Sequence, residues 1–260
     1  MNIDDSIVMQ YLAGEPSERC RDAWVFRTFG GKSIFAEPNP RHKDWVAALH
    51  QKLKRQLLDF TPRNRETVTA LFPGFDAVTQ DYTAMLVVGF PDPYDAMFLS
   101  HEGRDAVVFD LIQFSETALA PDYSCHRVLT HELLHLCIQR EYPSEAAKTY
   151  AENLDYIAFN EGFAHALSYP ENLSAFALDA QLAKKYLAAK TTLAAACRES
   201  SPEKQRVFLQ TADTGDYWEK FASISGKLYL LKHKNELQGI YRAGWRGFCE
   251  KILRDEVHPA

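Results

Sequence analysis

The chain has 260 residues, of which 46% are hydrophobic and 25% are charged, and its formal net charge is −6. This is the composition of a globular protein with enough apolar side chains for a sizeable core, in one large domain or two small ones. The acidic balance offers no basic field for nucleic acid or for an anionic membrane, so neither partner is expected.

No apolar run approaches the length needed to cross a membrane, and the acidic N-terminus lacks the order of a secretion signal. The five cysteines form no Cys-x-x-Cys pair. Cys125 and Cys137 are 12 positions apart on one predicted helix, too far to bridge. The cysteines are therefore expected to be buried thiols in a reducing compartment, and the protein is predicted to be cytoplasmic.

The N-terminal segment is predicted to contain a β-hairpin and two helices, of which the first helix is the clearest element. Apolar residues on either side of a Gly-Gly pair favour a β-hairpin between residues 24 and 35. An amphipathic helix is predicted from about residue 43 to 59, and a second short helix between residues 62 and 74. His42 and His50 fall on the polar side of the first helix and are expected to be solvated.

The hydrophobic pattern of the next segment is that of β-strands. Residues 84–90 and 106–114 are rich in Val, Leu, Ile and Phe and are bounded by Gly, Pro and Asp. The nearby His101, Glu102 and Asp105 are a tempting metal site. They lie on a glycine turn with no helix to bring the side chains together, so we interpret them as a decoy.

A His-Glu-x-x-His pattern follows, as His131-Glu132-Leu133-Leu134-His135. Independent placement of residues in a chain of this composition gives roughly 0.02 occurrences of the pattern. Residues four apart share one face of an α-helix, so His131 and His135 can both direct an imidazole nitrogen at one metal ion, with zinc the first choice. Glu132 then lies beside the metal without ligating it and can accept a proton from a metal-bound water. The alternative is a helix with two partly exposed histidines, against which the apolar flanks argue.

Two histidines need a third protein ligand, and Glu161 is the first candidate. Residues 147–168 have the pattern of a second helix, with Glu161 in its apolar stripe. An ionised carboxylate there is expensive unless it is paired or bound to a cation, so the position favours ligation. The alternative is a buried Glu161 paired with an Arg or with His165. Were Glu161 not the ligand, His165 and Asp155 would be the next candidates.

These residues resemble the gluzincin branch of the zincin metallopeptidases, in which two histidines and a downstream glutamate bind zinc. The string Asn-Glu-Gly-Phe-Ala at 160–164 is similar to the third-ligand helix of gluzincin aminopeptidases and to a stretch of little-characterised bacterial proteins predicted to be zinc proteases. Those proteins often carry a Gly-containing apolar helix further on, which residues 221–229 match. The resemblance covers roughly residues 105–230. The chain lacks a motif for gripping a free amino terminus before the first zinc helix, and His165 stands where thermolysin-like enzymes carry an aspartate.

The expected fold class is α+β and, by the resemblance, zincin-like. A single catalytic domain over residues 1–260 would have a mixed sheet in its N-terminal half (1–115), a mainly helical C-terminal half (116–260), and the metal site between them. The resemblance also implies that the strand at 106–114 is an edge strand that can bind an extended peptide, although its residues suit an ordinary core strand equally well. Further helices are expected at 173–198, 203–211, 217–233 and around 245–253.

The pattern predicts a zinc hydrolase, most directly a metallopeptidase acting on a peptide or protein substrate. Glu132 would accept a proton from water and later pass it to the leaving amine. The candidate donors to the oxyanion are Tyr217, Tyr229 and His165. Each also has a purely structural interpretation, which is packing for the two tyrosines and support of the zinc site for His165. Two other functions stay open, namely a zinc hydrolase of another amide and a zincin scaffold used for binding. The intact Glu132 counts against a purely structural zinc site, which needs no base.

Overall fold

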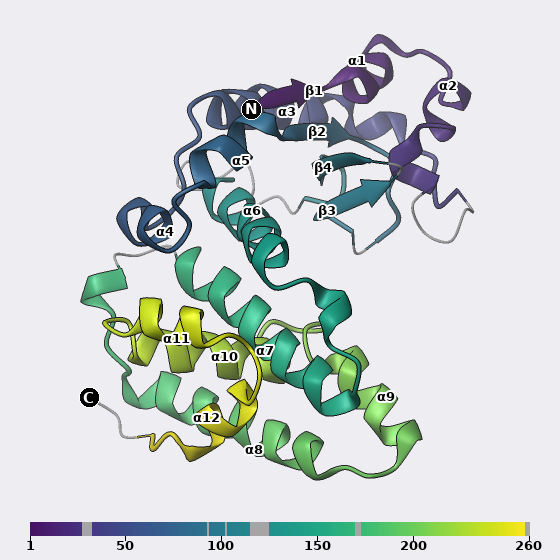
Figure 1. The fold of residues 1–260 in the computed structure, drawn as a ribbon. Helices are drawn as coiled ribbons and strands as arrows, with labels where there is room; N and C mark the ends of the chain where they lie inside the picture. The colour runs from purple at the N-terminus through teal and green to yellow at the C-terminus, as the bar shows by residue number, and fades with distance from the viewer. Residues whose placement is uncertain (28–32, 93, 102, 115–124, 170–172, 258–260) are drawn as a thin grey trace. The chain divides into compact units, whose positions relative to one another are not determined.

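The computed structural model describes residues 1–27, 33–92, 94–101, 103–114, 125–169 and 173–257 (Figure 1). The chain divides into two compact units. Unit 1 comprises Met1–Pro62 and Gly74–Leu133, and unit 2 comprises Arg63–Pro73 and Leu134–Ala260. The division falls inside helix α6 (His126–Glu141). A single domain, and a metal site between the sheet and the helices, stay predictions.

Unit 1 contains a mixed sheet whose described strands have the order β1-β2-β4-β3 (Figure 1). The strands are β1 (Asn2–Asp4), β2 (Thr83–Val87), β3 (Ala96–His101) and β4 (Arg104–Asp110). β1, β2 and β4 are parallel, whereas β3 is antiparallel to β4, and Val107 lies opposite both Ala84 and Phe98. β2 and β4 are buried except at their first residues, because apolar side chains fill both faces of the strands. The predicted mixed sheet in the N-terminal half is confirmed.

The strand that precedes α6 is not an edge strand, contrary to what the resemblance implied. β4 lies between β2 and β3 and pairs with both. The antiparallel edge is β3, which the sequence analysis missed because its apolar run is too short to show a period. At the decoy, His101 lies opposite Arg104 next to the β3-β4 turn, and Glu102 is outside the described residues.

The helices that lie wholly in unit 1 are α1 (Ser6–Ala13), α2 (Glu18–Arg21), α3 (Lys43–Leu58) and α5 (Phe75–Asp81). α3 confirms the amphipathic helix, with Leu49 and Leu53 buried. The hairpin is wrong in its first arm, because Trp24–Arg27 forms a 3-10 helix, and its turn falls outside the described residues. His50 is buried rather than solvated. Its Nε2 lies 2.8 Å from Oδ2 of Asp5, so the carboxylate replaces water as its polar partner.

The described part of unit 2 is helical, as predicted for the C-terminal half. Its helices, besides the end of α6, are α4 (Arg65–Leu71), α7 (Tyr150–Leu167), α8 (Ala180–Arg198), α9 (Pro202–Thr211), α10 (Phe221–Lys232), α11 (Leu237–Ala243) and α12 (Phe248–Arg254). The chain as a whole is therefore mixed α/β, with most of its helices after the sheet.

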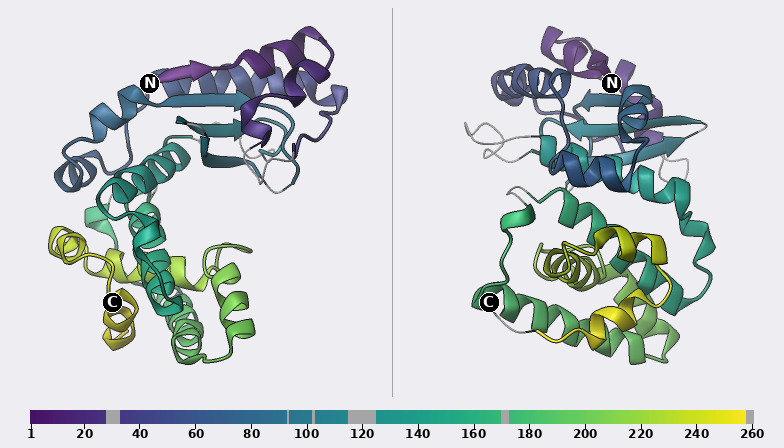
Figure 2. Two further views of the ribbon diagram at one scale, coloured as in Figure 1. Left: turned by 45° about the vertical axis from the view of Figure 1, so that its right-hand side comes forward. Right: turned by 60° about the vertical axis from the view of Figure 1, so that its left-hand side comes forward.

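Helices α7 and α10 pack against each other among the C-terminal helices (Figure 2). They meet at two glycines, Gly162 on α7 and Gly226 on α10. A Cβ on Gly162 would lie 2.9 Å from Cα of Gly226, and a Cβ on Gly226 would overlap the carbonyl oxygen of Ala158. The two backbones are thus in contact, which only glycine permits at these positions. Every residue of α10 from Phe221 to Leu231 is buried. The crossing fixes α10 against the helix that carries Glu161.

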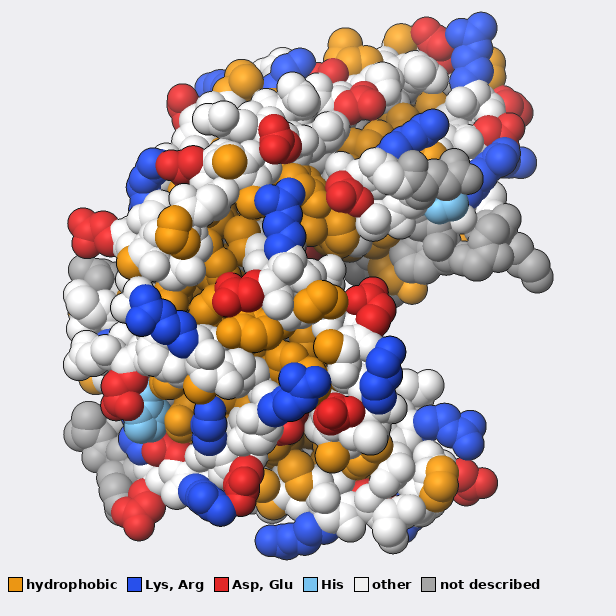
Figure 3. All heavy atoms as spheres, in the orientation of Figure 1, with side chains coloured by type: hydrophobic (Ala, Val, Ile, Leu, Met, Phe, Trp, Pro, Cys, Tyr) orange, Lys and Arg blue, Asp and Glu red, His pale blue; other side chains and the backbone are white. Residues whose placement is uncertain are grey.

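The surface carries mixed charges. On the face drawn in Figure 3, Lys and Arg side chains are interspersed with Asp and Glu side chains. In the described part of the chain, no helix is both long and apolar enough to cross a membrane.

Cys197 is exposed, so the expectation that the cysteines are buried holds for the other four and fails for this one.

Asp110, the last residue of β4, is buried and caps two loops. Its Oδ2 accepts the backbone N–H groups of Gly89 and Phe90 at 2.8 and 2.7 Å, and its Oδ1 accepts those of Ile112 and Gln113 at 2.8 and 3.1 Å. Burial raises the pKa of this carboxyl to about 6, and the four N–H donors oppose that rise. The folded state therefore binds more protons than the unfolded chain between about pH 4 and 6, and the contribution of Asp110 to stability falls as the pH rises through that window.

We predict that Asp110→Asn lowers the free energy of unfolding by about 2 kcal/mol near pH 7, because the amide turns its own N–H groups toward two buried backbone donors. Urea denaturation followed by circular dichroism measures the loss. Asp105→Asn, at an exposed position of the same strand, is the control and should stay within about 0.5 kcal/mol of the native protein. Equal unfolding midpoints for the two variants would contradict the capping role.

Candidate metal centre

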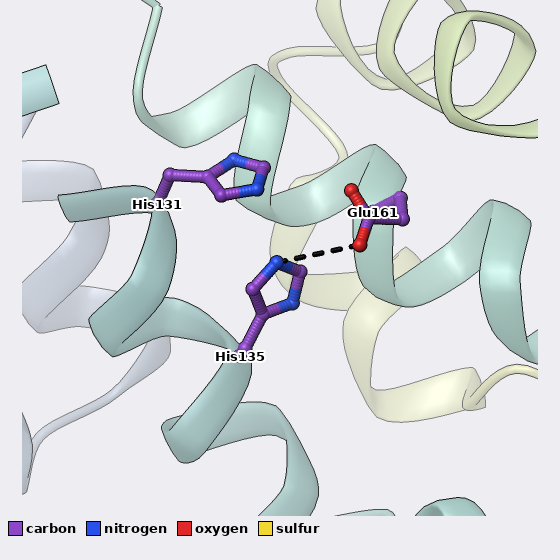
Figure 4. Close-up of side chains that lie close together, drawn as sticks. All are labelled: His131, His135 and Glu161. Atoms are coloured by element: carbon purple, nitrogen blue, oxygen red, sulfur yellow. Dashed lines mark ion pairs between the residues drawn. The ribbon is translucent and has the colours of Figure 1, made fainter. Parts of the chain in front are cut away.

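Two imidazoles and a carboxylate from α6 and α7 can hold a metal ion. His131, His135 and Glu161 each offer one ligand atom, and these atoms all lie within 4.8 Å of one another. Figure 4 shows the histidines on one helix facing the glutamate on the other. All three residues are half-buried. The structure thus brings together the three residues that the sequence predicted as zinc ligands.

Helix α6 sets the positions of the two histidines. They lie one turn apart, so their side chains leave the helix on the same face. Glu132, the predicted base, follows His131 directly and is half-buried like the histidines. The rest of the helix surface is largely apolar and buried, through Leu129, Leu133, Leu134, Leu136 and Ile138. This packing fixes the rotation of α6 about its axis.

Helix α7 begins at a capping box and so places Glu161 in a defined phase. The Thr149 hydroxyl accepts the backbone N–H of Glu152 at 3.2 Å, and Oε2 of Glu152 accepts the N–H of Thr149 at 3.0 Å. The capping box thus satisfies two backbone N–H groups at the start of the helix. The helix therefore starts at Tyr150, slightly later than the predicted residue 147.

The contact between Glu161 and His135 has the spacing of two ligands of one ion. Nε2 of His135 lies 3.4 Å from Oε1 of Glu161. Two ligand atoms with zinc bonds of about 2.0–2.1 Å at a tetrahedral angle are about 3.4 Å apart. Burial raises the pKa of the Glu161 carboxyl, and the charge of His135 opposes that rise. A bound divalent cation would favour the ionised carboxylate, so the donor set fits zinc in number and type, and the pair His135–Glu161 also fits it in spacing.

Asn160 selects the tautomer of His135 that ligation needs. Its Oδ1 lies 2.8 Å from Nδ1 of His135, and its Nδ2 donates to the Tyr156 hydroxyl at 3.1 Å. With Nδ1 donating to this acceptor, the lone pair of Nε2 faces Glu161 and a metal. Asn160 is buried, which holds the arrangement in place. Asn160 belongs to the ligand string at 160–164, but its contact with His135 was not predicted from the sequence.

His165 and Tyr217 continue the site outward from Glu161. Nε2 of His165 lies 3.5 Å from Oε2 of Glu161, and the His165 ring meets the Tyr217 ring edge-on at 5.7 Å. Nζ of Lys227 donates to the Tyr217 hydroxyl at 2.5 Å and lies 5.1 Å from the Tyr169 ring centroid. Lys227 is buried on α10, and it was not predicted, although a lone lysine inside an apolar helix is a visible signal.

Two other residues named from the sequence have contacts elsewhere. Tyr229 is buried in the core, where its ring lies 4.6 Å from that of His233 and 5.5 Å from that of Phe248. Asp155, the alternative ligand, accepts the backbone N–H groups of Gly247 and Cys249. These contacts give both residues a role in packing and leave Glu161 as the carboxylate of the cluster.

Two charged residues near the cluster had no signal in the sequence beyond a turn-like composition. The charge of Asp213 raises the pKa of Glu161, and the charge of Lys220 lowers it. Burial in turn raises the pKa of Asp213, which lies just after α9 and also interacts with His135. The electrostatic environment of Glu161 is therefore shaped by the segment between α9 and α10.

Comparison with known proteins identifies no relative of this chain. No protein-family model matches the sequence, and the searches of curated proteins and of solved structures each find no match. The chemistry of the site is therefore argued from its own side chains.

Proposed function

We propose that this protein is a zinc-dependent hydrolase, and specifically a metallopeptidase. The observation that carries the proposal is the convergence of His131, His135 and Glu161 within 4.8 Å, with Glu132 adjacent to the first ligand. A site with three protein ligands has a fourth position for water, which is the arrangement of catalytic rather than structural zinc. The resemblance to gluzincins points to the same residues in the same roles.

Zinc is the metal that suits this donor set. Two imidazole nitrogens and one carboxylate oxygen are borderline ligands, softer than the all-oxygen sets that Mg²⁺ and Ca²⁺ prefer. When bound, zinc supplies a Lewis acid and lowers the pKa of water toward neutrality. His131, His135 and Glu161 would hold the ion, and Asn160 would keep His135 in its ligating tautomer.

Glu132 acts as the general base and then as the general acid. It follows His131 directly on α6, one step round the helix from the face of the two histidines, and from there its carboxylate would reach the region where water is activated. It takes a proton from that water as the scissile carbonyl is attacked. It then gives the proton to the departing amine, so that one carboxyl group serves both steps of amide hydrolysis.

Tyr217 is the preferred donor to the oxyanion. Its hydroxyl accepts a hydrogen bond from Nζ of Lys227 at 2.5 Å, and a phenol hydroxyl that accepts can also donate. The adjacent positive charge strengthens the phenol as a donor. The Tyr217 ring contacts the His165 ring edge-on, and His165 in turn contacts the carboxylate of Glu161. Tyr229, which packs in the core against Phe248, lacks such a link to the cluster among its described ring contacts.

We predict that Glu132→Gln reduces peptide cleavage at least about 100-fold while zinc content is unchanged, because the variant loses the base but no ligand. The measurement combines cleavage of a quenched-fluorescent peptide library with elemental analysis. Glu145→Gln, at an exposed position, is the matched control and should cleave like the native protein. Full activity in Glu132→Gln would reject the mechanism, and a native protein that retains zinc but cleaves no peptide would favour another amide or a binding role.

We also predict that Tyr217→Phe lowers kcat about 100-fold with little change in KM, because the hydroxyl acts on charge that develops only in the transition state. Tyr229→Phe should leave kcat within about twofold of the native value, since its ring is a packing group. Both variants should bind zinc normally, which elemental analysis checks. A larger loss for Tyr229→Phe than for Tyr217→Phe would reverse the assignment.

A further inference from the structure

Two of the five cysteines are neighbours in space on unit 2. Cys197 is exposed near the end of α8, and Cys249 is buried in the first turn of α12. Both side chains line one pocket, and each shifts the pKa of the other. The remaining cysteines, Cys20, Cys125 and Cys137, are buried. The pair thus combines one thiol that solvent can reach with a second thiol directly behind it.

The surroundings hold the pair in place and give it access. Both cysteines line a pocket of about 280 Å³ together with Asp155 on α7. The two carboxylate oxygens of Asp155 accept the backbone N–H groups of Gly247 at 2.7 Å and of Cys249 at 2.8 Å. Gly247 has the left-handed φ of 72°, which starts α12 at this point. A small reagent can therefore reach a Cys249 whose backbone is anchored from α7.

The two thiols differ in acidity in the direction that a reactive pair needs. The hydrogen bond from Cys249 lowers the pKa of Cys197, which favours the thiolate on the exposed residue. The same bond, together with burial and the nearby Asp155, raises the pKa of Cys249, which stays a thiol. An exposed thiolate beside a protonated thiol is the arrangement of an attacking and a resolving cysteine.

We infer that Cys197 and Cys249 form a redox-reactive site whose substrate is a small peroxide and whose product is a disulfide between α8 and α12. The Cys197 thiolate attacks one peroxide oxygen, the O–O bond breaks, and a sulfenic acid forms while hydroxide leaves and takes up a proton. The sulfur of Cys249 then displaces the sulfenic oxygen as water, using its own proton, and the S–S bond forms. In total the two thiols lose two electrons, and one hydrogen peroxide becomes two waters.

The geometry requires only a local movement for this step. The two sulfurs, which share one pocket, need only come together to a bond of about 2.0 Å. The disulfide closes the segment from α8 through α12 and fixes both helices to α7 through Asp155, on the helix that carries Glu161. The inference does not depend on the metal site, because none of the proposed ligands takes part in the chemistry.

Peptide mapping of the full-length protein tests the inference directly. The protein is treated with one equivalent of hydrogen peroxide, alkylated, digested with trypsin without reduction and analysed by mass spectrometry. Peptides 191–198 and 247–251 each contain one cysteine of the pair. We expect them to be joined in a species two hydrogens lighter than their sum, and free thiols to fall from five to three per chain, the difference being the two linked cysteines. Dithiothreitol should reverse both changes.

Two variants assign the roles of the cysteines. Cys249→Ser should stop at the sulfenic acid, so that dimedone labels Cys197 at least about tenfold more than Cys125. Cys197→Ser should leave Cys249 unoxidised under the same conditions. The inference is overturned if the thiol count stays at five, if Cys197 of the native chain proceeds to sulfinic acid without the link, or if the disulfide joins two chains.

Discussion

The carboxyl group of Glu161 imposes the strongest constraint on the arrangement of this site. It lies on α7 between buried neighbours, Asn160 and Gly162, and burial raises its pKa. A carboxyl group in such a place must be protonated, paired or bound to a cation. The imidazole of His135 at 3.4 Å offers partial compensation, and a divalent metal shared with His131 would provide the rest.

The support around Glu161 comes from close helix packing. The Gly162 and Gly226 contact brings α10 against α7 with no side chain between the backbones. That approach also delivers Lys227, whose ammonium group contacts Tyr217 at the hydroxyl and the Tyr169 ring. The glycine contact therefore places the ligand helix and the proposed oxyanion donor in one packed arrangement. The two glycines allow the close approach of the helices and take no part in the proposed chemistry.

Long periodic segments were predictable from the sequence, and short or partner-dependent ones were not. α6 and α7 each span several turns, so the shared face of His131 and His135 and the inward position of Glu161 were visible in the spacing. β1 has only three residues and the apolar run of β3 is short, so neither strand shows a period in the sequence and both were missed. The expectation that β4 is an edge strand came from the resemblance to gluzincins, whose specific residues lie only in the two helices of the predicted ligands.

Interactions between residues far apart in sequence were also beyond prediction. His50 was expected in solvent because its partner, Asp5, is 45 positions away. The hydrogen bond between Asn160 and His135, and that between Lys227 and Tyr217, likewise depend on how helices pack. Residue type and spacing predict the candidate ligands, whereas the groups that orient them appear only once the helices are placed.

Metal content is the most direct test of the central claim that these three residues bind zinc. The native protein, Glu161→Ala and the exposed control Glu145→Ala are each purified without added metal. Their zinc content is then measured by elemental analysis. The account predicts about one zinc per chain in the native protein and the control, and little in Glu161→Ala, because two histidines alone do not complete the site. Unchanged zinc in Glu161→Ala would reject Glu161 as the third ligand. A native protein that binds no zinc even after incubation with the ion would contradict the account as a whole.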